Sequence, residues 1–190
     1  KDPKEDPNHI EKRIFKIIEV VKHNINIPVA AKIGPYFTSM TRVAEGMRKS
    51  GASGLVLFNR FYQPDIDIDT FEFQSKNRYS SPGEMSHSLR WIAILFEKFG
   101  GSLIGNTGIH DGEAVVKQLL AGASAVELCS TLYINGLGQI EVMLSFLEKW
   151  MRKNGYRDIA EFRGKISHKN AIQREYFERK QYIRAIVGED

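Results

Sequence analysis

The fold is decided by the stretch Ile27-Pro-Val-Ala-Ala-Lys-Ile33, a short apolar run bounded by a proline and a glycine. Such a run predicts a buried β-strand, with one charge, Lys32, near its carboxyl end. A helical pattern follows over 38–50, where apolar side chains recur every three or four residues. Leu55-Val-Leu-Phe58 is the next apolar run. The order of strand, helix and strand predicts a βαβ unit with a parallel sheet.

The same cycle recurs along the chain and predicts about four βα units, at 27–50, 54–99, 102–121 and 125–154. This alternation is typical of an α/β protein with a parallel sheet. A complete (β/α)8 TIM barrel needs about 250 residues, so four units indicate either half a barrel or a small open sheet. No Gly-x-Gly-x-x-Gly follows the first strand, which argues against a dinucleotide site. Within 60–80, a stretch with period-two alternation predicts one small extra strand.

Composition and charge exclude several classes of protein. The chain has 190 residues, of which 42% are hydrophobic and 26% charged, as in an ordinary globular domain. Its single cysteine argues against a disulfide framework or a cysteine-rich metal site and favours a reducing cytoplasm. No apolar run approaches the ~20 residues of a membrane helix, and no signal peptide is visible. The net charge of +4 arises in 151–190, where charges alternate in sign, and this favours a solvated face over nucleic-acid binding.

Short polar clusters follow the predicted strands, at the edge where a parallel α/β sheet binds its ligands. After the third and fourth strands these clusters are Asn106-Thr-Gly-Ile109 and Cys129-Ser-Thr131. Both precede helices, and turns of this kind expose N–H groups that bind phosphate. We therefore expect a phosphate site there, with ordinary helix caps as the alternative.

Individual side chains near the strand ends allow more than one role. The ammonium of Lys32 needs a partner, either a nearby carboxylate or the carbonyl or ring nitrogen of a ligand. Asn59 can both donate and accept hydrogen bonds, which suits a planar amide or imide ligand or the following turn. We expect Cys129 to be a small buried residue rather than a nucleophile, and His110 to be a cap or surface residue.

Taken together, these clusters resemble the C-terminal half of the dihydroorotate dehydrogenase family, and most closely its bacterial dihydroorotate dehydrogenase-like subgroup. The resemblance covers about 10–165 and rests on five motifs in the family's order. They are Ile27-Pro-Val-Ala-Ala-Lys-Ile-Gly-Pro-Tyr-Phe37, Gly54-Leu-Val-Leu-Phe-Asn59, Ile104-Gly-Asn-Thr-Gly-Ile-His-Asp-Gly-Glu113, Leu120-Ala-Gly-Ala-Ser-Ala-Val-Glu-Leu-Cys-Ser-Thr-Leu132 and Gly155-Tyr-Arg-Asp-Ile-Ala-Glu-Phe-Arg-Gly164. The resemblance implies that 1–165 supply the C-terminal units of an FMN-binding TIM barrel, and that 166–190 form a helical tail packing on it.

The resemblance also implies a function, that of a flavoprotein oxidoreductase which oxidises dihydroorotate to orotate in pyrimidine biosynthesis. Hydride would pass from the substrate's C6 to N5 of the flavin. Carried over position by position, Lys32 lies beside the flavin ring, and Asn59 binds the substrate. The implied FMN-binding residues are Lys32, Ser81, Gly105, Thr107, Gly108, Cys129 and Ser130. Thr107 stands where the family has glycine, so its Cβ opposes a positive φ while its hydroxyl could add a bond to phosphate.

The family's catalytic base, a Cys or Ser, lies on a loop of the first half of the barrel. We therefore expect this chain to be a C-terminal fragment, or the ordered part of a longer protein, with no catalytic residue of its own. Such a fragment alone would not oxidise dihydroorotate. Its open sheet edges favour a homodimer. The electron acceptor, whether fumarate, quinone or NAD through a second subunit, stays open.

Three other functions remain as alternatives. An FMN barrel of the dihydropyrimidine dehydrogenase type would use the same lysine and phosphate turns, but its uracil-like substrate would not need the cationic corner that Arg60 could offer to orotate's carboxylate. A non-catalytic phosphate- or nucleotide-binding module would use Thr107, Gly108 and Ser130 without redox chemistry. A half-barrel interaction subunit would dock a partner through a helix within 166–190. Bound flavin separates the first of these from the others.

Overall fold

The computed structural model describes residues 6–75 and 77–170. Its centre is a four-stranded parallel sheet with the order β1-β2-β5-β6. The strands are β1 (Ala30–Ile33), β2 (Gly54–Leu57), β5 (Ser102–Gly105) and β6 (Ala125–Val126). Because the order in space follows the order in the chain, every crossover moves one strand in the same direction. Consecutive units of a barrel have this topology, whereas a doubly wound sheet reverses its order.

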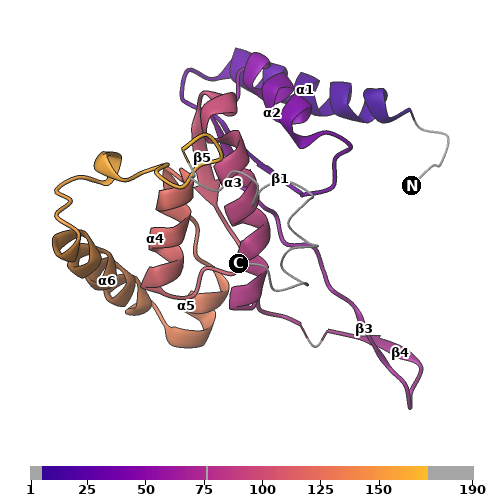
Figure 1. The fold of residues 1–190 in the computed structure, drawn as a ribbon. Helices are drawn as coiled ribbons and strands as arrows, with labels where there is room; N and C mark the ends of the chain where they lie inside the picture. Colours follow the sequence, from indigo (N-terminus) through magenta and orange to yellow (C-terminus); the bar gives the residue numbers. More distant parts are fainter. Residues whose placement is uncertain (1–5, 76, 171–190) are drawn as a thin grey trace, which may run out of the picture.

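The helices form a layer in which neighbours in the sequence are neighbours in space (Figure 1). In this layer α1 packs on α2, α2 on α3, α3 on α4, and α4 on α6. The α-helices are α1 (Pro7–Asn24), α2 (Met40–Lys49), α3 (Met85–Phe99), α4 (Gly112–Ala121), α5 (Ser130–Asn135) and α6 (Gln139–Lys153). The described residues also contain two 3-10 turns, η1 (Pro82–Glu84) and η2 (Ile159–Glu161). None of the described helices is long and apolar enough to cross a membrane.

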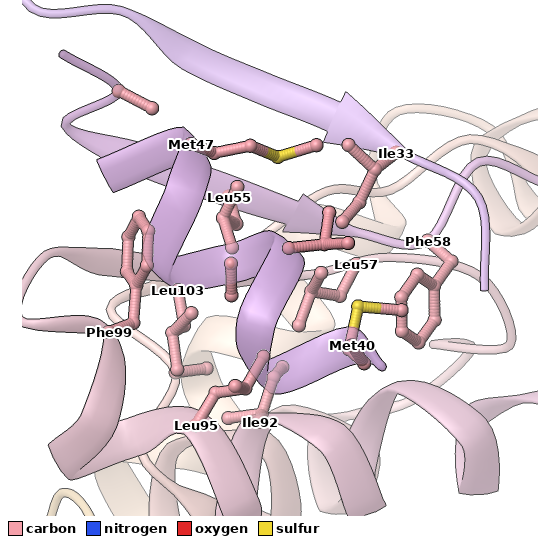
Figure 2. Packing of buried hydrophobic residues seen from close by; sticks show 14 of the residues in the cluster. Ile33, Met40, Met47, Leu55, Leu57, Phe58, Ile92, Leu95, Phe99 and Leu103 are labelled. Carbon is pink, nitrogen blue, oxygen red and sulfur yellow. The ribbon is translucent and has the colours of Figure 1, made fainter. Parts of the chain in front are cut away.

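The main hydrophobic core lies between one face of the sheet and helices α2 and α3 (Figure 2). Alternate strand side chains enter it, because successive residues of a strand point to opposite faces. The buried side chains from the strands and the two helices include Ile33, Leu55, Leu57, Leu103, Met40, Met47, Ile92, Leu95 and Phe99. Burying each large side chain contributes about 1.5–3 kcal/mol. This burial orients the sheet, so the intervening positions face away from the helices.

Those intervening positions form one row across the opposite face of the sheet. Lys32 is in register with Val56, Val56 with Ile104, and Ile104 with Ala125. Glu127 lies two residues beyond Ala125 and immediately follows the last strand. A charged side chain therefore lies at each edge of the sheet, Lys32 within the row and Glu127 just beyond its other end.

A second cluster joins α4, α6 and the segment after α6. Phe162 is fully buried and packs against the rings of Trp150 and Tyr156, at centroid distances of 5.0 and 5.2 Å. The chain then returns to the helix layer, because the N–H of Ile166 donates to the Leu120 carbonyl and that of His168 to the Ala93 carbonyl. The predicted C-terminal tail thus begins against α3 and α4. The helix predicted farther along, within 171–190, lies outside the described residues.

The excursion after β2 differs from the single strand predicted for it. It is an antiparallel hairpin of β3 (Asp65–Asp67) and β4 (Glu72–Gln74) that projects from the body of the molecule (Figure 1). The turn is made by Asp67, whose carboxylate accepts the N–H groups of Asp69 and Thr70. Cross-strand pairing places Ile66 opposite Phe73, and the apolar positions shift by one residue across the turn, from Ile66 and Ile68 to Phe71 and Phe73. The short helix α5 was also not predicted.

Candidate functional site

A cleft of about 420 Å³ opens at the carboxyl ends of the parallel strands. Lys32 from β1 and the segments that follow β2, β5 and β6 contribute to its walls, together with part of the stretch between β4 and η1. We call it the strand-end cleft. Its volume lies within the range of about 300–1,000 Å³ that is usual for small-molecule sites. Six of the predicted positions line it, namely Lys32, Asn59, Thr107, Gly108, Cys129 and Ser130.

An ion pair crosses the cleft from one edge of the sheet to the other. The ammonium of Lys32 donates to Oε2 of Glu127 at 2.9 Å, and the two side chains are 44% and 42% exposed. Lys32 lies on β1 and Glu127 follows β6, so the pair spans β2 and β5. The salt-bridge interpretation of Lys32 is confirmed, and both side chains line the strand-end cleft.

The turn after β5 has two consecutive residues with positive φ, Thr107 at 72° and Gly108 at 78°. Thr107 adopts the left-handed conformation at a cost of about 1–2 kcal/mol for a residue with a Cβ. Its hydroxyl donates to the carbonyl oxygen of Phe58 at 3.1 Å, which helps to hold the turn. This donated proton is not available to a phosphate, so Thr107 can offer a ligand its N–H rather than the predicted hydroxyl bond.

Asn106 is a residue of this site that the sequence analysis did not assign. It is 7% exposed and lines the strand-end cleft. Its side-chain Nδ2 donates to the same Phe58 carbonyl at 2.9 Å, and its main-chain N–H donates to the Leu57 carbonyl at 2.7 Å. Asn106 therefore ties the turn after β5 to the end of β2. Its position directly after an apolar strand was the only available signal.

Ser80 joins three parts of the cleft wall. Its N–H donates to Oγ of Ser130 at 2.9 Å, and its own Oγ accepts from the N–H of Gly108 at 3.3 Å. The same oxygen lies 3.1 Å from Nε2 of His110, which is half-buried. His110 therefore braces this loop, whereas we expected a cap or surface residue. Since Ser130 accepts from Ser80, its hydroxyl proton can still be donated to a ligand.

Two predicted positions lie outside the strand-end cleft. Ser81 starts η1, where its N–H donates to Glu84 Oε1 at 2.7 Å, and it lines an adjacent cleft. Gly105 faces the helix layer instead. A Cβ added there would come within 2.9 Å of the side chain of Gln118, which is fully buried. Glycine at 105 therefore makes room for Gln118.

The prediction of a buried Cys129 is wrong, because its thiol is exposed in the cleft wall. Strand β6 comprises only Ala125–Val126, so the chain has left the sheet before it reaches Cys129. The described residues contain no group of three or more His, Cys, Asp or Glu side chains that could hold a metal ion.

The guanidinium of Arg60 forms hydrogen bonds within the protein. It donates to Glu84 Oε2 at 2.8 Å and to the carbonyls of Asn77 and Tyr79 at 2.8 and 3.2 Å. Partial burial by itself would raise the pKa of Glu84. The hydrogen bonds from Arg60 and from the Ser81 N–H outweigh burial and hold that pKa below its ordinary value of 4.5. Arg60 and Glu84 thus brace the loop before α3.

Comparison with known proteins identifies the family. A profile described as dihydroorotate dehydrogenase matches residues 7–151. This chain belongs to the dihydroorotate dehydrogenase family. The catalytic subunit of dihydroorotate dehydrogenase B (NAD(+)) from Pyrococcus furiosus is 28% identical to it, with 84% of this chain and 53% of that protein covered. The corresponding subunit from Saccharolobus solfataricus is 30% identical, with 78% and 52% covered. A putative dihydroorotate dehydrogenase A (fumarate) from Aquifex aeolicus is 28% identical, with 80% and 51% covered.

The chain spans about half the length of the curated relatives that it matches. This coverage agrees with four parallel βα units, which is half the number in a (β/α)8 barrel. The predicted α/β class and partial barrel are therefore confirmed. The names of these relatives include both NAD(+) and fumarate.

Proposed function

We propose that the strand-end cleft binds FMN and that the protein oxidises dihydroorotate to orotate. The convergence of Lys32, Asn59 and the Thr107–Gly108 turn in one cleft carries this proposal. Family membership supports it, because the relatives are dihydroorotate dehydrogenases by name. When bound, FMN would supply the acceptor for the substrate's hydride. The cytoplasmic location and the homodimer stay predictions.

The residues of the cleft fit the parts of FMN. The main-chain N–H of Thr107 and the hydroxyl of Ser130 are hydrogen-bond donors, as a phosphate requires, whereas the N–H of Gly108 already donates to Ser80 Oγ. Gly108 cannot carry a side chain, because an added Cβ would lie 2.3 Å from the main-chain nitrogen of Met85. Glycine at 108 therefore allows this turn to pack closely against the start of α3. We assign Thr107, Gly108 and Ser130 to the phosphate, with Cys129 beside them.

Lys32 and Asn59 line the remainder of the cleft and suit the ring systems. The ammonium of Lys32 would favour a ring that gains negative charge. The amide of Asn59 would orient the pyrimidine through paired donor and acceptor groups. The thiol of Cys129 lies with the phosphate donors, so we do not assign it as the catalytic base. We propose that the base comes from residues outside this chain, and that residues 1–190 alone do not oxidise dihydroorotate.

An FMN enzyme acting on an uncharged pyrimidine, of the dihydropyrimidine dehydrogenase type, is the second candidate. One observation favours it. The Arg60 guanidinium, which could otherwise bind a substrate carboxylate, is occupied by Glu84 and two main-chain carbonyls. The two candidates therefore differ in the charge of the substrate that the cleft accepts.

The visible absorption spectrum of the full chain that the gene encodes, recorded anaerobically, tests these proposals. We expect a flavin spectrum that bleaches on addition of dihydroorotate and persists with dihydrouracil. The reverse pattern would establish the second candidate. Lys32→Gln should slow the bleaching, whereas Lys117→Gln should not, because Lys117 pairs with Glu113 on α4 outside the cleft.

Two further results would contradict the proposals. A colourless protein that also fails to take up added FMN would refute the flavin site. Bleaching by residues 1–190 alone would show that this chain carries its own base.

A further inference from the structure

Glu127 has no part in the proposed function, yet it is the carboxylate that meets the Lys32 ammonium in the strand-end cleft. The main chain is held in place at both residues. Lys32 lies within β1, and the N–H of Glu127 donates to the Gly105 carbonyl at 2.8 Å. The pair therefore reflects where the sheet places its two edges, and it does not depend on a loose loop.

The Lys32–Glu127 pair contributes little to the folding stability of the protein. Both side chains are more than two-fifths exposed, and exposed ion pairs change a folding equilibrium by a factor of about five at most. The consequence for a ligand is larger, because the cleft presents a neutralised lysine instead of a free cation. A carboxylate 2.9 Å from the ammonium offsets most of its attraction for a negative charge nearby.

We propose that Glu127 is the positioning residue for Lys32, and that it holds the ammonium in the cleft and weakens the preference of the site for negatively charged ligands. This inference rests on the proposed FMN site. If Lys32 lies beside the flavin ring, Glu127 lowers the affinity for reduced FMN, which carries more negative charge, relative to oxidised FMN. The flavin of this protein then has a lower midpoint potential than Lys32 alone would set.

The test compares Glu127→Gln with the wild type in the full chain. Glutamine keeps the size of the side chain and removes its charge. The matched control is Glu113→Gln, which breaks the Lys117 pair on α4, an ion pair of similar exposure outside the cleft. We expect Glu127→Gln to raise the affinity for reduced over oxidised FMN about tenfold, which shifts the midpoint potential by about +30 mV for a two-electron couple. Glu113→Gln should leave the potential unchanged.

A second readout does not depend on flavin. Acylation of Lys32 by an amine reagent, followed by peptide mass spectrometry, should be several-fold faster in Glu127→Gln and unchanged in Glu113→Gln. If the wild type binds FMN and Glu127→Gln changes the affinities of both redox states equally, the pair is a structural brace and the inference is wrong. If the wild type binds no FMN, the proposed function fails instead. In that case, a rate of Lys32 acylation that is the same in Glu127→Gln as in the wild type would show that Glu127 does not hold Lys32, and the inference would be wrong.

Discussion

Replacing Gly108 with alanine tests how closely the turn after β5 approaches the start of α3. The residue has a φ of 78°, and an added Cβ would lie 2.3 Å from the Met85 nitrogen and 2.9 Å from its Cα. The left-handed conformation costs an alanine about 1–2 kcal/mol. The contacts are with main-chain atoms that cannot rotate away, so overpacking adds about 1–3 kcal/mol. We expect Gly108→Ala to destabilise the protein by about 2–5 kcal/mol, which is the sum of these two costs.

Gly136 provides the control. It has the same φ of 78°, and an added Cβ would find nothing within 4 Å. Gly136→Ala should therefore show only the conformational cost of about 1–2 kcal/mol. Urea unfolding followed by circular dichroism measures both variants. The midpoint of Gly108→Ala should lie about 1 M below that of Gly136→Ala, for a slope of 1–3 kcal/mol per molar. Equal midpoints would refute the close approach of the turn to Met85.

Three further predictions concern stability. Phe162→Ala removes a fully buried ring and should cost about 3–5 kcal/mol in urea unfolding, whereas Phe71→Ala, at a position 88% exposed, should cost little; similar losses would contradict the second core. Asp111→Ala removes the acceptor for the Ala114 N–H at 2.8 Å and should destabilise the protein by about 1 kcal/mol. Asp111→Asn should retain most of the wild-type stability, because asparagine also caps a helix. The pKa of Glu84 in the folded protein is held below its ordinary value of 4.5, so folding favours the charged carboxylate and the group stabilises the fold at neutral pH. Unfolding across an acid series should show the wild type losing this contribution as the pH falls below 4.5, while Glu84→Gln lacks it throughout.

Local periodicity was sufficient to predict the sheet and most of the helices. Short continuous apolar runs mark β1 and β2, and apolar residues recur every three or four positions in α2, whose apolar face is buried against the sheet. The hairpin was missed because the alternation over 66–73, as one stretch, predicts a single strand. The apolar positions of this stretch change phase at the turn, from Ile66 and Ile68 to Phe71 and Phe73, and this shift marks the reversal of the chain.

The candidate site was predictable where it depends on the ends of strands. Lys32, Asn59, Thr107 and Ser130 meet because parallel strands end at one edge of the sheet. Contacts between distant segments were not predictable in this way. Ser80 holds the cleft through partners 28–50 residues away, and the Lys32–Glu127 pair joins residues 95 positions apart.

The affinity of the full chain for FMN, compared with its affinity for riboflavin, tests the central claim most directly, because the two flavins differ only in the phosphate. We expect FMN to bind at least about tenfold more tightly, the contribution of hydrogen bonds to a charged group. Ser130→Ala should reduce this ratio. Ser124→Ala, which removes an acceptor for Arg163 outside the cleft, should leave the ratio unchanged. Equal affinities for FMN and riboflavin would contradict a phosphate site at the Thr107–Gly108 turn and Ser130.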